Sequence, residues 1–419
     1  MSRIFREAFT LESADGELPE GTEAEVALES EEAANEILEA DREVEMAELQ
    51  EDELTDAEES LESIVMSLES LIEKDPRGLD RVAAEGYRHA VRAIVGSALD
   101  NPVASLESFG SSTECQHATE LSLEGIKDTL RKIWEAIKRA VKNAIRAVGD
   151  FFAKLFGGVS KLKDRAKKVK EKAEGLKKDG AVAEGKVAIP GADRLALGGK
   201  LTEQVLFNDG PQRVQTNAIA LSDNQQALAE DFYSRLTSSY TKKEEEVGEV
   251  IAKGLTRTLE EIKKKVGQEL PGGRAFHTTE RNTEEDGADI RVPRLGDYSR
   301  KVNFDGKNEI DVPSLDKTIA LLGTLITYCE SLEKKKSKRD ALKKAREDAM
   351  TAGEKLVKDG EQGKLGQYWT QAKLNVALRL ANRDFATVVA RADGYVFSYV
   401  RAAVAACDAI VSKYKAKKD

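Results

Sequence analysis

The residue types that most often carry catalysis are few and scattered in this chain. Its 419 residues include three histidines and three cysteines, and only Cys115 and His117 among them lie close together. A structural zinc site needs four ligands at regular spacing, so chance accounts for this pair better than metal binding does. The sequence contains neither a phosphate-binding loop ending in Gly-Lys-Ser/Thr nor a Gly-x-Ser-x-Gly nucleophile elbow. We therefore expect no enzyme, no metal site and no cofactor.

One recurring tripeptide suggests chemistry that is done on the chain rather than by it. Ser-Leu-Glu occurs at 60–62, 67–69, 105–107 and 122–124, and once more at 331–333. A protease holds its substrate as an extended strand and reads alternate side chains, and exposed segments are the preferred sites of cleavage. The first two copies, seven residues apart, are explained equally well by the rhythm of an acidic helix. The copy at 105–107 follows a proline break and begins a small, polar stretch.

Charge divides the chain near the last of the four clustered copies. Residues 1–124 carry 33 Asp or Glu and 8 Lys or Arg, a net charge of −25, whereas residues 125–419 carry a net charge of +14. The overall charge of −11 hides this difference. Such asymmetry suggests a polyanion partner, or an acidic tail that masks the binding site for one.

The elements that must position these features are mostly helical in the acidic part. Apolar residues recur at threes and fours over 31–73, and a shorter helix is expected over 80–98. Residues 107–120 are small, polar and without periodicity, which predicts an exposed linker.

The clearest amphipathic helix is expected over 123–178, with Gly157-Gly158 kinking or dividing it. Between 125 and 180 there are 17 basic and 7 acidic residues. Lys and Arg side chains that neutralise phosphates give sequence-independent, salt-sensitive affinity. The candidate polyanion-binding residues are Lys132, Arg139, Lys142, Lys167 and Lys168. A solvated helix face remains an equally good explanation of the cluster.

The same helix also has the composition of an interfacial membrane helix. Trp134, Phe151-Phe152 and Leu155-Phe156 lie opposite its basic face. An apolar stripe followed by further helices usually packs on them, and no run of apolar residues is long enough for a membrane span. A membrane is therefore not the expected partner.

The rest of the chain predicts a mainly α fold of long helices, forming a helical bundle with a small β or irregular insert. Aromatic residues make up 5% and charged residues 34%, which favours long solvated helices. Further helices are expected at about 217–270, 315–359 and 366–415. Short strands are expected at 187–189, 195–197 and 205–207 within loops over 179–212, and a β-hairpin or irregular insert over 274–313.

The acidic first part with its clustered Ser-Leu-Glu copies resembles the internal head proteins of giant tailed phages related to phiKZ. Those proteins carry acidic propeptides, which a prohead protease removes by cutting after Glu in a Ser/Ala-x-Glu context. The resemblance covers residues 1–124 in organisation, and residues 125–419 match no domain of known activity.

The resemblance implies cleavage after Glu107 or Glu124, with Glu62 and Glu69 as earlier cuts. The residues of the two main sites are Ser105, Leu106, Glu107 and Ser108, and Ser122, Leu123, Glu124 and Gly125. The expected parts are an acidic propeptide at 1–107, helical or disordered, and a cleavable linker at 108–124. They are followed by a basic amphipathic helix at 125–180 and a mainly helical body with its small insert at 181–419.

The resulting hypothesis is a structural protein of the capsid interior, present in the host cytoplasm before assembly. Its expected partners are the prohead protease, capsid or other inner-head proteins, and double-stranded DNA bound non-specifically. Three cysteines without paired spacing and an N-terminus without an apolar signal segment agree with a reducing compartment. Two alternatives stay open: a membrane-active or ejected effector masked by an acidic prosegment, and a cytoplasmic helical scaffold.

Overall fold

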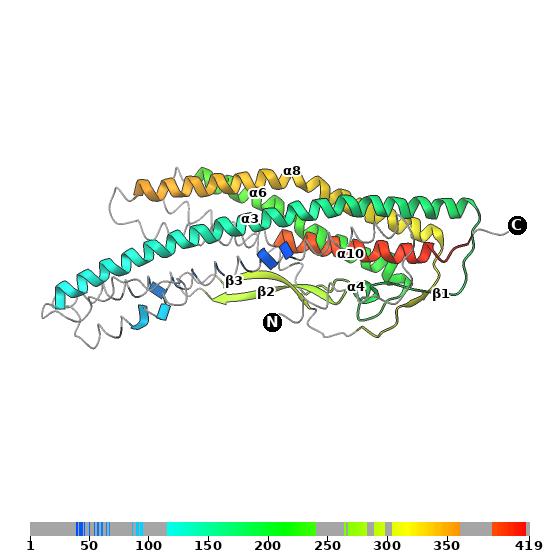
Figure 1. The fold of residues 1–419 in the computed structure, drawn as a ribbon, viewed down its shortest axis with the longest axis horizontal. Helices are drawn as coiled ribbons and strands as arrows, with labels where there is room; N and C mark the ends of the chain where they lie inside the picture. Colours follow the sequence, from blue (N-terminus) through cyan, green and yellow to red (C-terminus); the bar gives the residue numbers. More distant parts are fainter. Residues whose placement is uncertain are drawn as a thin grey trace. The chain divides into compact units, whose positions relative to one another are not determined.

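The computed structural model describes residues 115–239, 267–282, 289–297, 304–360 and 388–415, together with position 264 and single positions between 39 and 94. The side chains of residues 115–131 are not among those described. The chain divides into two compact units. The smaller unit is residues 41–147, and the larger unit is residues 148–419 with residues 1–40. Long helices make up most of the described chain (Figure 1), which confirms the mainly α fold class.

Helix α3 is longer and more regular than the sequence indicated. It covers Cys115–Lys178, 64 residues, so it begins eight residues before Leu123 and takes up half of the expected linker. No Gly or Pro lies between 115 and 122 to stop a helix there. Gly157-Gly158 does not divide it, although each glycine costs about 1 kcal/mol in a helix. Leu155 and Val159, on either side of the pair, are fully buried, and their packing offsets that cost.

The larger unit is a helical bundle, and ion pairs between α3 and α8 show the relative direction of these two helices. Helix α8 covers Leu315–Gly360, close to the expected 315–359. Lys163 of α3 pairs with Glu333, and Lys177, further along α3, pairs with Asp316. The later residue of α3 thus pairs with the earlier residue of α8, so the two helices run antiparallel.

Helix α10, Val388–Val411, is the central element of this unit. It packs against α8, against α6 (Ala220–Ser239), against the short helix α4 (Ala192–Leu195) and against strands of both small sheets. Among the described helices, α10 alone has the length and apolarity that a membrane crossing would need, and 61% of its most apolar window is buried inside the protein. Packing on all sides accounts for its composition, because a helix enclosed by other elements is apolar all round.

A continuous helix from Glu203 to Ser239 contains two π-helical segments. These are η2, Val205–Asp209, and η3, Val214–Ile219, on either side of the α-helical turn α5, Gly210–Arg213. The strand expected at 205–207 is therefore wrong. Pro211 has no N–H to donate, and the preceding turn is widened so that the Gly210 N–H donates to the carbonyl of Val205. Tyr328 of α8 donates its hydroxyl to the Pro211 carbonyl at 2.8 Å.

Two small antiparallel sheets complete the described fold. Strand β1 (Lys186–Ala188) pairs with β4 (Glu309–Asp311), and the buried Val187 lies opposite the buried Ile310. Strands β2 (Arg274–Asn282) and β3 (Asp289–Asp297) form a nine-pair hairpin, which confirms the insert expected over 274–313.

The apolar run at 195–197 is not the strand that its composition suggested. Leu195 is the last residue of α4 and is buried. The helices expected over 217–270 and 366–415 are described in part as α6 and α10, and residues 240–263 and 361–387 lie outside the described part of the chain. The first of these helices does not reach residue 270, because Gly267 lies in a turn with a positive φ and Leu270 forms a β-bridge with Arg274.

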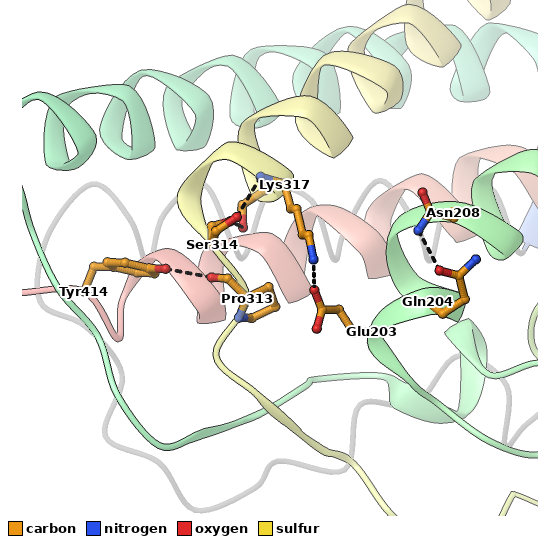
Figure 2. Close-up of polar contacts among 8 residues, drawn as sticks. Glu203, Gln204, Asn208, Pro313, Ser314, Lys317 and Tyr414 are labelled. Atoms are coloured by element: carbon orange, nitrogen blue, oxygen red, sulfur yellow. Dashed lines mark hydrogen bonds and ion pairs between the residues drawn. The ribbon is translucent and has the colours of Figure 1, made fainter.

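Contacts at the first turn of α8 join three segments that are distant in the sequence (Figure 2). Ser314 caps the helix, accepting the Lys317 N–H with its hydroxyl oxygen at 3.4 Å. Lys317 pairs with Glu203 at 2.5 Å, and the Tyr414 hydroxyl donates to the carbonyl of Pro313 at 2.7 Å. The start of α8 is thereby held to the start of the π-containing helix and to the C-terminal end of the chain.

Candidate nucleic-acid interface and processing sites

The five candidate polyanion-binding side chains are all solvent-exposed. Lys132, Arg139 and Lys142, the Lys132 patch, lie in the smaller unit at spacings of seven and three. Residues at these spacings share one helix face. Lys167 and Lys168, the Lys168 patch, lie in the larger unit. Exposed cations on a helix can contact phosphates with little loss of solvation, so each patch can bind a polyanion.

The apolar side of α3 in the larger unit is packed inside the protein. Phe151 is 1% exposed, and a Cβ added at Gly394 of α10 would stand 3.1 Å from its ring. Phe152 is 9% exposed and lies 3.5 Å below the guanidinium of Arg339. Leu155 is fully buried. Three of the residues that resembled a membrane-facing surface thus face α8, α10 and the interior of the bundle, as the packing expectation required.

A buried ionic cluster joins α6, α8 and α10 beneath this aromatic contact. Asp393 of α10 is fully buried, and its carboxylate pairs with Lys335 at 3.3 Å and with Arg339. Lys335 also reaches Asp223 at 2.7 Å and donates to the Ser222 hydroxyl at 3.0 Å. Two cations thus meet two carboxylates.

The surroundings of Arg339 explain how it stays buried. Burial lowers the pKa of its guanidinium, while the charges of Asp393 and Asp223 raise it. The planar guanidinium stacks on Phe152 on one side and pairs with a carboxylate on the other. Each charged side chain of the cluster pairs with at least one opposite charge on another helix, so the cluster fixes how α6, α8 and α10 pack together.

The fold treats the Ser-Leu-Glu copies differently. Ser122-Leu123-Glu124-Gly125 lies inside α3, with helical backbone, and residues 101–114, which hold the copy at 105–107, lie outside the described part of the chain. In the copy at 60–62, Leu61 is helical and fully buried. In the copy at 331–333, Leu332 is 1% exposed and Glu333 pairs with Lys163 at 2.5 Å. The hydrogen bond to Glu333 raises the pKa of Lys163.

The cysteines and metal ligands contribute no further site in the described region. Cys329 and Cys407 are free and buried, and burial raises the pKa of Cys329 to about 12. Among the residues described, no group of three or more His, Cys, Asp and Glu could hold a metal ion. The side chains of Cys115 and His117 are not described.

The comparison with protein families decides which class of protein combines these features. A family model of phiKZ-like phage internal head proteins matches residues 23–409. The chain belongs to this family. Neither the curated proteins nor the solved structures contain a match. The resemblance of the acidic part to this family is confirmed, and the match extends over nearly the whole body of this internal head protein, including the described helices α3, α6 and α8 and residues 388–409 of α10.

Membership fixes the general role. The proteins of this family are internal proteins of the phage head, which places this chain among the structural proteins of the head interior. The buried cluster at Asp393 fits that role, because it joins helices.

One basic surface of the internal head protein was not singled out from its sequence. Helix α8 carries exposed lysines over 334–344, at Lys334, Lys336, Lys338, Lys343 and Lys344. The run Glu-Lys-Lys-Lys-Ser-Lys-Arg at 333–339 was the available signal. Lys335 and Arg339 of this run are buried in the cluster, and only the structure separates the buried cations from the exposed ones.

Proposed function

We propose that this internal head protein is made with an acidic prosegment, that the prohead protease removes it after a Ser-Leu-Glu copy, and that the remaining basic body contacts packaged DNA or the inner shell. Its other partners are capsid and inner-head proteins. The observation that carries the proposal is the change in charge at the expected cut.

Cleavage after Glu107 would convert a chain of net charge −11 into a body of +11, and cleavage after Glu124 would give +14. DNA repels the first and attracts the second at long range. Binding through phosphates is independent of sequence and weakens steeply with salt. Such a protein stays off DNA until it is processed, and then binds wherever phosphates are dense.

The cleavage site at Glu124 lies within a helix, which bears on where the cut falls. A protease needs its substrate extended, whereas Glu124 lies ten residues into α3. Cleavage there requires the first turns of α3 to unwind. Cleavage after Glu107 leaves the whole of α3 intact. This helical backbone at Glu124 favours the bond after Glu107 as the cut that sets the N-terminus of the mature body.

The first test uses the protein from mature particles. Its intact mass and N-terminal sequence should show a chain that begins at Ser108, with Gly125 as the other start that the proposal allows. Full-length protein in purified particles would contradict the proposal and favour an uncleaved scaffold.

The second test asks whether charge on α3 carries DNA binding. A full-length chain is cut at introduced protease sites after Glu62 and Glu107, the acidic fragments are removed, and the remaining body is measured against duplex DNA between 50 and 200 mM salt. Reversal of the Lys132 patch with K132E, R139E and K142E should weaken binding at every salt concentration, and should lower the slope of log affinity against log salt by roughly one for each lost phosphate contact.

A matched control changes the same charge elsewhere. K200E, K307E and K413E reverse three exposed lysines that lie outside α3 and α8. If this control weakens binding as much as the α3 variant, only net charge matters and the α3 contact is wrong. If the cut chain fails to bind DNA at low salt, DNA is not the partner of the body.

A further inference from the structure

The acidic segment and the first half of α3 belong to one compact unit. The smaller unit, residues 41–147, combines the described positions of the acidic segment between 42 and 94 with α3 up to Ala147. A prosegment that simply trailed from the body would not share a compact unit with it.

The acidic segment is amphipathic within this unit. Its buried apolar side chains are Val44, Leu54, Leu61 and Val91, each no more than 4% exposed. Other described positions of the segment, such as Glu43, Gln50 and Ser60, are exposed, and Met46 is 65% exposed. The described positions thus include a set of covered apolar side chains and a set of mostly polar side chains open to solvent, in a segment whose sequence is acidic.

The first half of α3 has the complementary character. Ile133 is fully buried, Ala140 is 2% exposed and Ile145 is 6% exposed. Lys132, Arg139 and Lys142, the Lys132 patch, are exposed on the same stretch. Both sets of buried side chains belong to this one compact unit.

We propose that residues 41–94 are a non-covalent cover on the apolar side of α3, and that this side of α3 is a binding surface for an acidic amphipathic helix. The apolar contact supplies the affinity, and the flanking cations attract the negative segment. The proposal rests on the proposed function only for the place of the cut. Cleavage between 94 and 124 then nicks the chain, and the acidic segment stays bound to α3.

The cover also orders the cleavage events. Leu61 is the middle residue of the Ser-Leu-Glu copy at 60–62 and is at the same time fully buried in the core of the cover. A protease can reach this copy only after the cover has opened. The cut at the linker therefore precedes the cut after Glu62, and the second cut destroys the cover and releases α3.

The test uses the full-length chain with a sequence-specific protease site introduced after Glu107. After complete cleavage the two fragments are examined by gel filtration and native mass spectrometry. We expect them to remain a one-to-one complex at 0.15 M salt. At 1 M salt the complex should weaken but persist, because salt screens the charges and does not weaken the apolar contact.

Two aspartate substitutions in the same segment form a matched pair. Leu61→Asp places a charge in the core of the cover, and the affinity of the nicked fragments should fall by roughly a hundredfold or more. Met46→Asp makes a similar change at an exposed position, and the complex should survive. Hydrogen exchange of residues 133–147 in the uncut Leu61→Asp chain should quicken, while exchange in α10 shows that the larger unit is still folded.

Separation of the unsubstituted fragments at 0.15 M salt would overturn the proposal. So would equal behaviour of the Leu61→Asp and Met46→Asp chains. These outcomes are independent of the proposed function, which fails when particles contain uncut protein or when the cut chain does not bind DNA.

Discussion

At the scale of single residues, the strongest constraint on this protein is the charge buried at Asp393. Its carboxylate has no exposed surface and pairs with two cations of α8, Lys335 and Arg339. Removing one partner of a buried ion pair costs about 3–5 kcal/mol, because the remaining charge is left uncompensated. We expect Asp393→Asn to lower the free energy of unfolding by about 3 kcal/mol or more, measured by urea denaturation followed by circular dichroism.

An exposed ion pair provides the control for this substitution. Asp231 pairs with Arg235 at 2.9 Å on α6, and their side chains are 44% and 65% exposed. Surface pairs contribute about 0–1 kcal/mol, so Asp231→Asn should change stability by less than about 1 kcal/mol. Equal losses for the two variants would mean that burial does not set the strength of the Asp393 contacts.

Gly210 marks the place where the π-helical segments permit no side chain. A Cβ there would stand 2.8 Å from the carbonyl oxygen of Val205 and 3.1 Å from the hydroxyl of Tyr399. Gly210→Ala should therefore destabilise the larger unit by about 1–3 kcal/mol, the usual cost of overpacking. Thermal unfolding measures the effect.

Another glycine with free space gives the opposite expectation. A Cβ at Gly323 of α8 meets nothing within 4 Å, so Gly323→Ala should raise stability by about 0.5–1 kcal/mol through helix propensity. Among the described residues the buried hydroxyl of Tyr399 has no hydrogen-bond partner. Tyr399→Phe should therefore reduce the stability loss of Gly210→Ala, because it removes one of the two close contacts. If Gly210→Ala is neutral, the π-helical geometry at this position is wrong.

At the scale of elements, α8 shows how a helix can hide a cleavage sequence. The copy at 331–333 has the same residues as the copies in the acidic part, yet Leu332 is buried and Glu333 is paired with Lys163. Cleavage after Glu333 requires local unfolding of α8, so its rate falls with the population of the open state.

We expect a Glu-specific protease to leave the bond after Glu333 intact in the folded chain. The fragments are identified by mass spectrometry after a short digestion. The same digestion in urea serves as the positive control and should cut this bond. Cutting at equal rates in both conditions would show that α8 does not protect the sequence.

At the scale of the whole molecule, the two compact units predict two separable unfolding events. Leu61 of the smaller unit and Leu322 of the larger unit are both fully buried, and replacing a buried Leu by Ala costs about 2–5 kcal/mol. We expect Leu61→Ala to speed hydrogen exchange in residues 133–147 and leave α10 unchanged, and Leu322→Ala to affect α10 first. Identical responses in both regions would mean that the units unfold as one.

The amphipathic pattern was enough to predict the main elements of this protein. The 3.6-residue rhythm located α8 almost to the residue, the weak alternation over 274–313 indicated a β-hairpin or an irregular insert where the hairpin lies, and the charge division with the clustered Ser-Leu-Glu copies led to the right family. These features are local or compositional, and each depends on residues close together in the chain. The expected strands at 195–197 and 205–207 failed because short apolar runs fit a buried helix as well as a strand.

Residues that look alike in the sequence differ in burial, and only the tertiary structure decides which of them are exposed and which are buried. Sequence treats Lys334 and Lys335 alike, but the fold exposes the first and buries the second against Asp393, 58 residues away. It likewise covers Leu332 of one Ser-Leu-Glu copy with its neighbours in the bundle. Composition and rhythm determined the helices, the charge division and the family. Burial determined which charges pair, and burial depends on segments that meet only when the chain has folded.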